Sequence, residues 1–209
     1  MSRSVKFYYG LSGAFKATTI KNNLKPRDSV MWSGIKKWKH WERNFIYNQN
    51  NPNDLNFALL HLFRLSELNY SIDKDETTLH IERGVTDMLF YWLLTHHAED
   101  QETIIKNLVE EELRVSKIAA GDIKEPEKIL LVQRDYDFVR NVVLKEETRS
   151  ERFETGIQDY IKAQDQYIDF TKRFNSITSE VIITDAREYL ESLGIEWKNS
   201  EIDNNKTKN

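Results

Sequence analysis

The stretch Val5-Lys6-Phe7-Tyr8-Tyr9-Gly10-Leu11-Ser12-Gly13-Ala14-Phe15-Lys16-Ala17-Thr18-Thr19 decides the fold of this chain. Residues 5–9 read as a buried strand that runs directly into a glycine-rich turn, a lysine and the start of a helix. This order is the outline of a phosphate-binding loop, G-x-x-x-x-G-K-[ST], which holds an anion with backbone N–H groups at a helix N-terminus. The sequence therefore predicts a segment that binds the phosphates of ATP, with the candidate cofactor-binding residues Gly10, Ser12, Gly13, Ala14, Phe15, Lys16, Ala17 and Thr18.

Two positions depart from the loop pattern. Phe15 stands where the second glycine belongs, and its Cβ would make a left-handed conformation strained. Ala17 stands where the hydroxyl ligand of Mg²⁺ belongs, and Thr18 lies about 100° further around a helix, so it is not an equivalent ligand. Metal binding would then rest on a carboxylate and waters, because Mg²⁺ often keeps several waters. An ordinary strand–turn–helix connection remains the alternative reading.

The composition is that of a globular protein. Charged residues make up 31% of the 209 residues and aromatic residues 11%. We expect one domain over residues 1–198 and a disordered polar tail over 199–209. The net charge of −4 argues against a dedicated nucleic-acid binder, and the absence of cysteine excludes disulfides and thiolate metal sites. No apolar run reaches transmembrane length and no signal peptide is evident, so we expect a cytoplasmic protein without a membrane partner.

Alternation of strands and helices predicts an α/β fold with three layers, in which helices flank a parallel sheet of about five strands. The predicted strands are 5–9, 29–32, 77–81, 129–132 and 180–184, and the predicted helices include 17–24, 35–47, 54–68, 101–117, 136–145, 154–174 and 187–193. Ligands of such sheets bind beyond the carboxyl ends of the strands. Three polar segments follow strands there, namely 10–16, Glu82-Arg83 and Arg134-Asp135, and we expect them to meet in one crevice.

Glu82 and Arg83 are candidates for chemistry at the end of a strand. A carboxylate there can hold Mg²⁺, and the neighbouring arginine can neutralise a phosphoryl group during transfer. The charged stretch 145–154 reads as a lid whose Arg149 and Arg152 would close over ATP. The alternatives are a surface ion pair for the first two residues and a solvated loop for the stretch.

Two further features are candidates for substrate binding. Arg64 lies on a long helix among apolar neighbours and either points into an acceptor cleft or packs its stem on the core. Trp32 begins a segment, 32–41, that mixes tryptophans with lysines and could stack a nucleobase or single-stranded nucleic acid. The second possibility motivates an alternative function, a kinase acting on a modified base within DNA.

The order of these motifs resembles that of thymidylate kinases and deoxynucleoside kinases, a group of P-loop kinases. Residues 10–18 resemble the thymidylate kinase loop G-L-D-G-A-G-K-T-T. Residues 59–64 resemble the part of the long third helix of those kinases in which an arginine follows a Leu/Phe-rich stretch. Glu82-Arg83-Gly84 is similar to the Glu-Arg-Ser of deoxynucleoside kinases, and residues 151–154 are similar to the lid sequence D-R-F-E. The resemblance extends from residue 5 to about residue 195 and implies a P-loop kinase-like fold with a helical lid.

The resemblance also implies a function, an ATP- and Mg²⁺-dependent deoxynucleoside monophosphate kinase. It gives catalytic roles to Lys16, Glu82, Arg83, Arg149 and Arg152, substrate contacts to Arg64 and Arg83, and metal binding to Glu82. Trp32 is a further substrate-binding candidate because of its aromatic and basic surroundings. The glutamate base that deoxynucleoside kinases keep after their second strand is missing, which favours a monophosphate acceptor. A homodimer is a further expectation, and the divergence indicates a viral enzyme, such as one from a phage. The departures at Phe15 and Ala17 leave open a nucleotide-binding or protein-interaction module that has lost catalysis.

Overall fold

The computed structural model describes residues 4–33, 54–71, 78–95, 101–120, 125–145, 156–175 and 180–197. Its sheet has five strands, β1 (Ser4–Tyr9), β2 (Ser29–Met31), β3 (Thr78–Glu82), β4 (Glu127–Val132) and β5 (Val181–Asp185), in the order β2-β3-β1-β4-β5. All four strand pairs are parallel, and the register places Glu82 beside Tyr8. Every strand in the described chain therefore ends at the same edge of the sheet.

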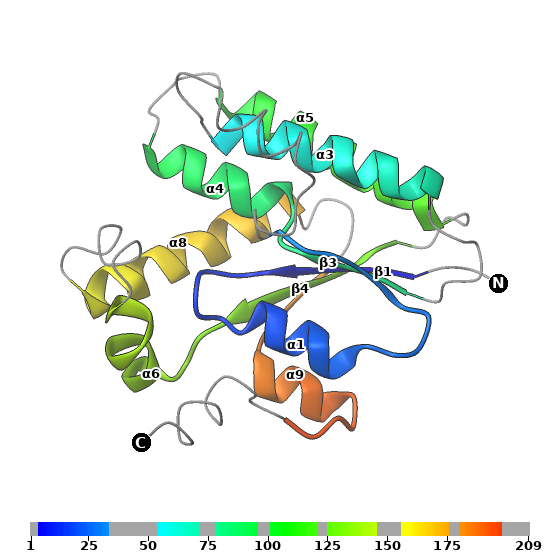
Figure 1. Ribbon diagram of the computed structural model, residues 1–209. Coiled ribbons are helices and arrows are strands. Elements are labelled where there is room, and N and C mark those ends of the chain that lie inside the picture. Colours follow the sequence, from blue (N-terminus) through cyan, green and yellow to red (C-terminus); the bar gives the residue numbers. More distant parts are fainter. Residues whose placement is uncertain are drawn as a thin grey trace.

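Helices cover both faces of this sheet (Figure 1). One face carries α1 (Lys16–Asn23) and α9 (Ala186–Ser192). The other carries α3 (Asp54–Ser71), α4 (Val85–Thr95), α5 (Gln101–Ala120) and α8 (Ile157–Asn175). A short helix α6 (Tyr136–Asn141) and a 3₁₀ turn η2 (Val143–Lys145) follow β4. The expected three-layer α/β fold is confirmed.

Strand alternation explains the two separate apolar cores. Side chains of a strand point to opposite faces in turn. Phe7 and Tyr9 therefore join the core under α3, α4, α5 and α8, whereas Tyr8 joins the core under α1 and α9. Both cores are built from side chains that are nearly inaccessible to solvent, so β1 is covered on both faces and is the buried strand expected over residues 5–9.

Some predicted boundaries were wrong by a few residues. The helix expected over 136–145 ends at Asn141 and continues as a 3₁₀ turn, in which Lys145 N donates to Val142 O. The β-branched pair Val142-Val143 has low helix propensity, which accounts for the break. The expected helix 35–47, the lid stretch from 146 onward and the polar tail lie outside the described residues. Within the described residues, none of the helices combines the length and apolar character that crossing a bilayer requires.

Candidate functional site

The loop between β1 and α1 has the backbone of an anion-binding turn. Gly10 and Gly13 have φ angles of 141° and 88°, and Phe15 has φ 55° and ψ 27°, the left-handed conformation. The strain expected for Phe15 is therefore present, because its Cβ crowds the backbone there. The loop keeps its turn although a bulky residue has replaced the second glycine of the pattern.

Side chains from three elements hold the carbonyl groups of residues 10–13. Lys16 Nζ donates to Gly10 O and, at 2.8 Å, to Leu11 O. Tyr160 OH on α8 donates to Ser12 O at 2.9 Å, and Gln133 Nε2 after β4 donates to Gly13 O at 2.8 Å. In a planar trans peptide the following N–H points opposite to the carbonyl. These bonds therefore turn the N–H groups of residues 11–13 away from their side-chain partners, in the manner of an anion-binding nest. The next amide, Ala14 N, instead donates to Leu11 O at 3.2 Å.

The N-terminus of α1 differs from those of three other helices. Asp87, Asp135 and Asp185 each accept a backbone N–H at the start of α4, α6 and α9. At α1, by contrast, the N-cap residue Phe15 makes no side-chain capping bond, and the first turn holds no acidic residue. The partial positive charge of this helix end is thus not offset by a carboxylate in its own cap or first turn.

The α1 N-terminus opens onto a cavity of about 390 Å³, which we call the loop cavity. It is lined by Ser12, Gly13, Phe15, Lys16, Ala17, Thr18, Glu82, Arg83, Phe138 and Val142. Two of the expected cofactor-binding residues lie behind it: Gly10 donates its N–H to Asp87, and Ala14 is buried in the core under α1. The structure thus brings the lysine of the loop together with the Glu-Arg pair of β3.

Glu82 and Arg83 are held by neighbouring strands. Glu82 Oε2 accepts from Ser33 N at 3.1 Å and from Ser33 Oγ at 3.0 Å. Arg83 has a left-handed φ of 62°, and its N–H donates to Tyr8 O at 3.0 Å. The left-handed turn ends the strand, so that the side chains of both residues reach the loop cavity.

The residues that line the loop cavity include one carboxylate, which makes the cavity a fit for Mg²⁺. Mg²⁺ is usually held by one or two carboxylates together with substrate phosphates and waters. Glu82 provides such a carboxylate, whereas Ala17 provides no hydroxyl. Among the described residues, no group of three histidine or carboxylate side chains forms a ready-made metal cluster.

Asp87 is a buried carboxylate beneath the loop that the sequence reading missed. Its Oδ1 accepts from Gly10 N and its Oδ2 from Gly84 N, both at 3.3 Å, so it joins the start of the loop to the start of α4. Burial raises the pKa of the Asp87 carboxyl, while the charges of Lys16 and Arg83 oppose that rise. The sequence did carry a signal for Asp87. An acidic residue three positions after the residue that precedes a helix can accept a hydrogen bond from the backbone N–H of that residue, and Asp87 stands three positions after Gly84.

Two of the predicted substrate-binding residues lie apart from the loop cavity. Arg64 on α3 donates to Trp32 O at 3.2 Å, and the Trp32 side chain packs on the core under α1. Neither residue lines the loop cavity. The predicted lid arginines, Arg149 and Arg152, lie outside the described residues.

A second cavity, of about 300 Å³, lies next to the first, and we call it the aromatic cavity. It is lined by Phe15, Val132, Gln133, Arg134, Asp135, Phe138, Asp185, Ala186, Arg187 and Trp197. The expectation that all three polar segments meet in one crevice was therefore wrong for Arg134 and Asp135. Asp135 caps α6. Arg134 pairs with Glu188 and lies 3.7 Å from Asp185, so its side chain is held toward β5 and α9.

Comparisons with known proteins support the fold. No protein-family model matches the chain, and no curated protein sequence gives a significant match. Solved structures do match: thymidylate kinase from Candida albicans has 14% identity and a TM-score of 0.58, over 98% of this chain and 93% of that one. Thymidylate kinase from Ehrlichia chaffeensis has 12% identity and a TM-score of 0.52, over 93% of this chain and 98% of that one. The chain thus has the α/β fold of these thymidylate kinase structures.

Proposed function

We propose that this protein is a nucleotide kinase that transfers the γ-phosphoryl group of ATP to a deoxynucleoside monophosphate. The observation that carries the proposal is the uncapped N-terminus of α1. It faces the loop cavity together with Lys16, Glu82 and Arg83. Backbone amides, a lysine and an arginine around one cavity are the groups that stabilise a transferring phosphoryl group.

The donor phosphates would lie in the loop cavity, against the loop amides. Lys16 is only 5% exposed and donates to two loop carbonyls, so its ammonium group must turn outward to reach a phosphate. A bound polyphosphate would replace those carbonyls as its partner. The base would lie in the adjoining aromatic cavity, which adds rings and polar edges within reach of the same loop.

Transfer would proceed by in-line attack of an acceptor phosphate oxygen on the γ-phosphorus, with cleavage of the bond to the bridging β–γ oxygen. Arg83 would neutralise charge on the group in transit. Mg²⁺ held by Glu82 would neutralise the donor phosphates when bound. An ionised acceptor phosphate needs no general base, which agrees with a cavity in which Glu82 is held by Ser33 rather than positioned as a base.

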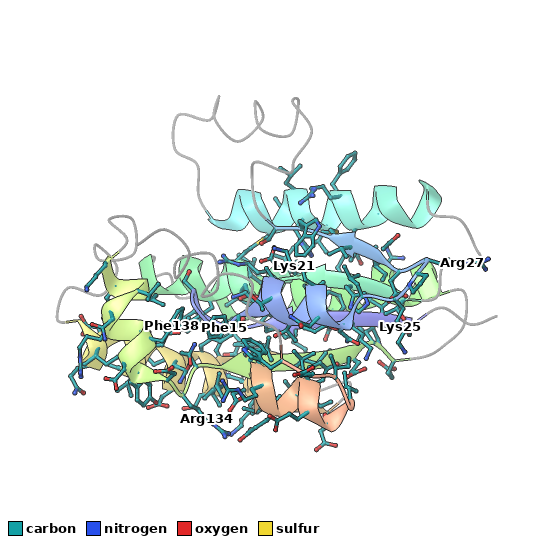
Figure 2. All side chains as sticks on the ribbon, turned by 60° about the horizontal axis from the view of Figure 1, so that its bottom comes forward. Phe15, Lys21, Lys25, Arg27, Arg134 and Phe138 are labelled. Atoms are coloured by element: carbon teal, nitrogen blue, oxygen red, sulfur yellow. The ribbon has the colours of Figure 1, made fainter. Side chains whose placement is uncertain are left out.

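The test is an assay for product with a matched pair of lysine variants. The protein is incubated with ATP, Mg²⁺ and each deoxynucleoside monophosphate in turn, and products are separated by chromatography. Lys16→Met should lower turnover about 10²- to 10³-fold, the range for loss of one charge-stabilising donor. Lys21→Met is the control, because Lys21 is exposed further along α1 (Figure 2) and should leave turnover unchanged.

The outcomes separate the proposal from its rivals. Formation of a diphosphate that depends on Lys16 supports a kinase. ATP binding without turnover of any acceptor would favour a binding or interaction module, a reading consistent with Phe15 and Ala17. Full activity of Lys16→Met, with circular dichroism showing a native fold, would refute the assignment of Lys16.

A further inference from the structure

Phe15 occupies a backbone conformation that glycine would adopt without strain. Its φ of 55° is left-handed, and bulky residues rarely take that conformation. Glycine also belongs at this position of the loop pattern. Such strain persists where surrounding structure compensates for it, and it clusters at ligand sites.

The compensation comes from contacts of the ring. The Phe15 centroid lies 4.7 Å from that of Phe138 on α6 and 5.4 Å from that of Trp197, which follows α9. Figure 2 shows Phe15 and Phe138 side by side at the start of α1. All three rings are only partly buried, so the cluster is not an ordinary piece of core. Partly exposed rings grouped beside a phosphate loop are suited to stacking a base.

The same two rings border both cavities. Phe15 and Phe138 line the loop cavity and the aromatic cavity alike. A nucleotide with its phosphates on the loop would therefore pass these rings to place its base in the aromatic cavity. The exposed residues Arg134 and Arg187 lie around that second cavity and offer polar groups to the edge of a base.

We propose that Phe15 is a specificity-determining residue of the donor site and that its ring forms the surface on which the nucleobase of the donor lies. The inference rests on the proposed nucleotide site and deepens it. A single loop residue then contributes to both halves of recognition, because its backbone forms the phosphate turn and its ring selects for an aromatic base. A bare polyphosphate would bind the loop without this contribution.

A competing role for the Phe15 ring predicts the opposite change in ATP affinity when the ring is removed. If the Phe15–Phe138 pair only blocked the passage between the two cavities, removal of the ring would raise the affinity for ATP. The left-handed backbone would also relax on substitution by glycine, which should favour binding further. The affinity for ATP relative to that for inorganic tripolyphosphate therefore distinguishes a base platform from a plug.

The experiment is calorimetric titration of the full chain with ATP and, separately, with tripolyphosphate. Phe15→Leu keeps an apolar side chain of similar size and the strained backbone, but it lacks the aromatic face. It should weaken ATP binding roughly 5- to 100-fold, the factor that corresponds to the loss of one base–aromatic stack. Tripolyphosphate binding should change by less than about twofold, and Phe15→Tyr, which restores the aromatic face, should bind ATP like the wild type.

The results separate failure of the inference from failure of the proposed function. If the wild type binds ATP no more tightly than tripolyphosphate, or if Phe15→Leu keeps wild-type affinity for ATP, the role of Phe15 is overturned while the phosphate site stands. Tighter ATP binding by Phe15→Leu or Phe15→Gly would identify the ring as a plug and overturn the role as well. If the wild type binds neither compound, both proposals fail.

Discussion

Gly84→Ala should destabilise the protein although Gly84 has an ordinary backbone conformation. A Cβ placed there would lie 2.8 Å from Glu112 Oε2, 2.9 Å from Glu112 Oε1 and 2.8 Å from Tyr9 Cε1. These distances are shorter than van der Waals contact, so one of the neighbours must move. The Glu112 carboxylate fills the space that a side chain at residue 84 would occupy.

Neither neighbour can move freely. Tyr9 is 1% exposed, and Glu112 is 2% exposed and accepts from Val85 N at 2.8 Å. His61 Nε2 lies 2.9 Å from Glu112 Oε1, without the alignment of a hydrogen bond. Overpacking of this kind costs about 1–3 kcal/mol. For a chain of this size each kcal/mol corresponds to about 2–4 °C, so the melting temperature should fall by roughly 2–12 °C.

Urea unfolding followed by circular dichroism measures this cost. Gly194→Ala is a matched control, because a Cβ at Gly194 has nothing within 4 Å and only the φ of 70° is unfavourable. That variant should lose about 1–2 kcal/mol from backbone strain alone. In the background of Glu112→Ala, which empties the space, Gly84→Ala should cost much less. If Gly84→Ala is as stable as the wild type, or equally costly in both backgrounds, the packing of Glu112 against Gly84 is refuted.

Two more predictions concern the hydroxyl group of Tyr160 and the imidazole of His80. Tyr160→Phe removes the hydroxyl that donates to Ser12 O, so the loop carbonyl loses this partner. The free energy of unfolding should fall by about 1–3 kcal/mol in urea titrations, and ATP should bind more weakly. An unchanged affinity for ATP would show that the loop holds its shape without that bond. Burial lowers the pKa of His80 below its usual 6.5, with Asp28 opposing. The unfolded chain is then protonated before the folded one as the pH falls through 6.5, so stability should decline by up to ~1.4 kcal/mol between pH 7.5 and 5.5. His80→Gln should remove that decline, and an identical pH dependence in the variant would contradict the assignment.

The sheet could be predicted from sequence because its signals are local. The apolar runs 5–9 and 129–132 each carry enough hydrophobic residues to require cover on both faces, and helices separate every pair of strands. Parallel pairing and the placement of residues 10–16 and Glu82 at one edge follow from that alternation. Local signals do not show that Arg134 pairs with Glu188, so they did not separate the Arg134-Asp135 segment from the loop cavity.

The candidate site was only partly predictable, because several of its residues act through contacts distant in sequence. Gln133 holds Gly13, a residue 120 positions away, and Tyr160 holds Ser12 from a distance of 148 positions. Nothing local to either residue indicates such a partner. The left-handed conformation of Phe15 was predictable from the loop pattern, whereas its packing against Trp197 depends on where the chain returns after α9.

The distribution of charge along the chain supports the α1 N-terminus as the anion site. The net charge is −4, yet the first acidic residue is Asp28, and it is preceded by Arg3, Lys6, Lys16, Lys21, Lys25 and Arg27. Of these, Lys16 lines the loop cavity, whereas the side chains of Lys21, Lys25 and Arg27 lie further along α1 and in the turn after it (Figure 2). An acidic protein repels polyphosphates at long range, so a segment without carboxylates is where a local positive potential can attract them. The carboxylates that cap α4, α6 and α9 would cancel such a potential, and the sequence around α1 contains none to do so.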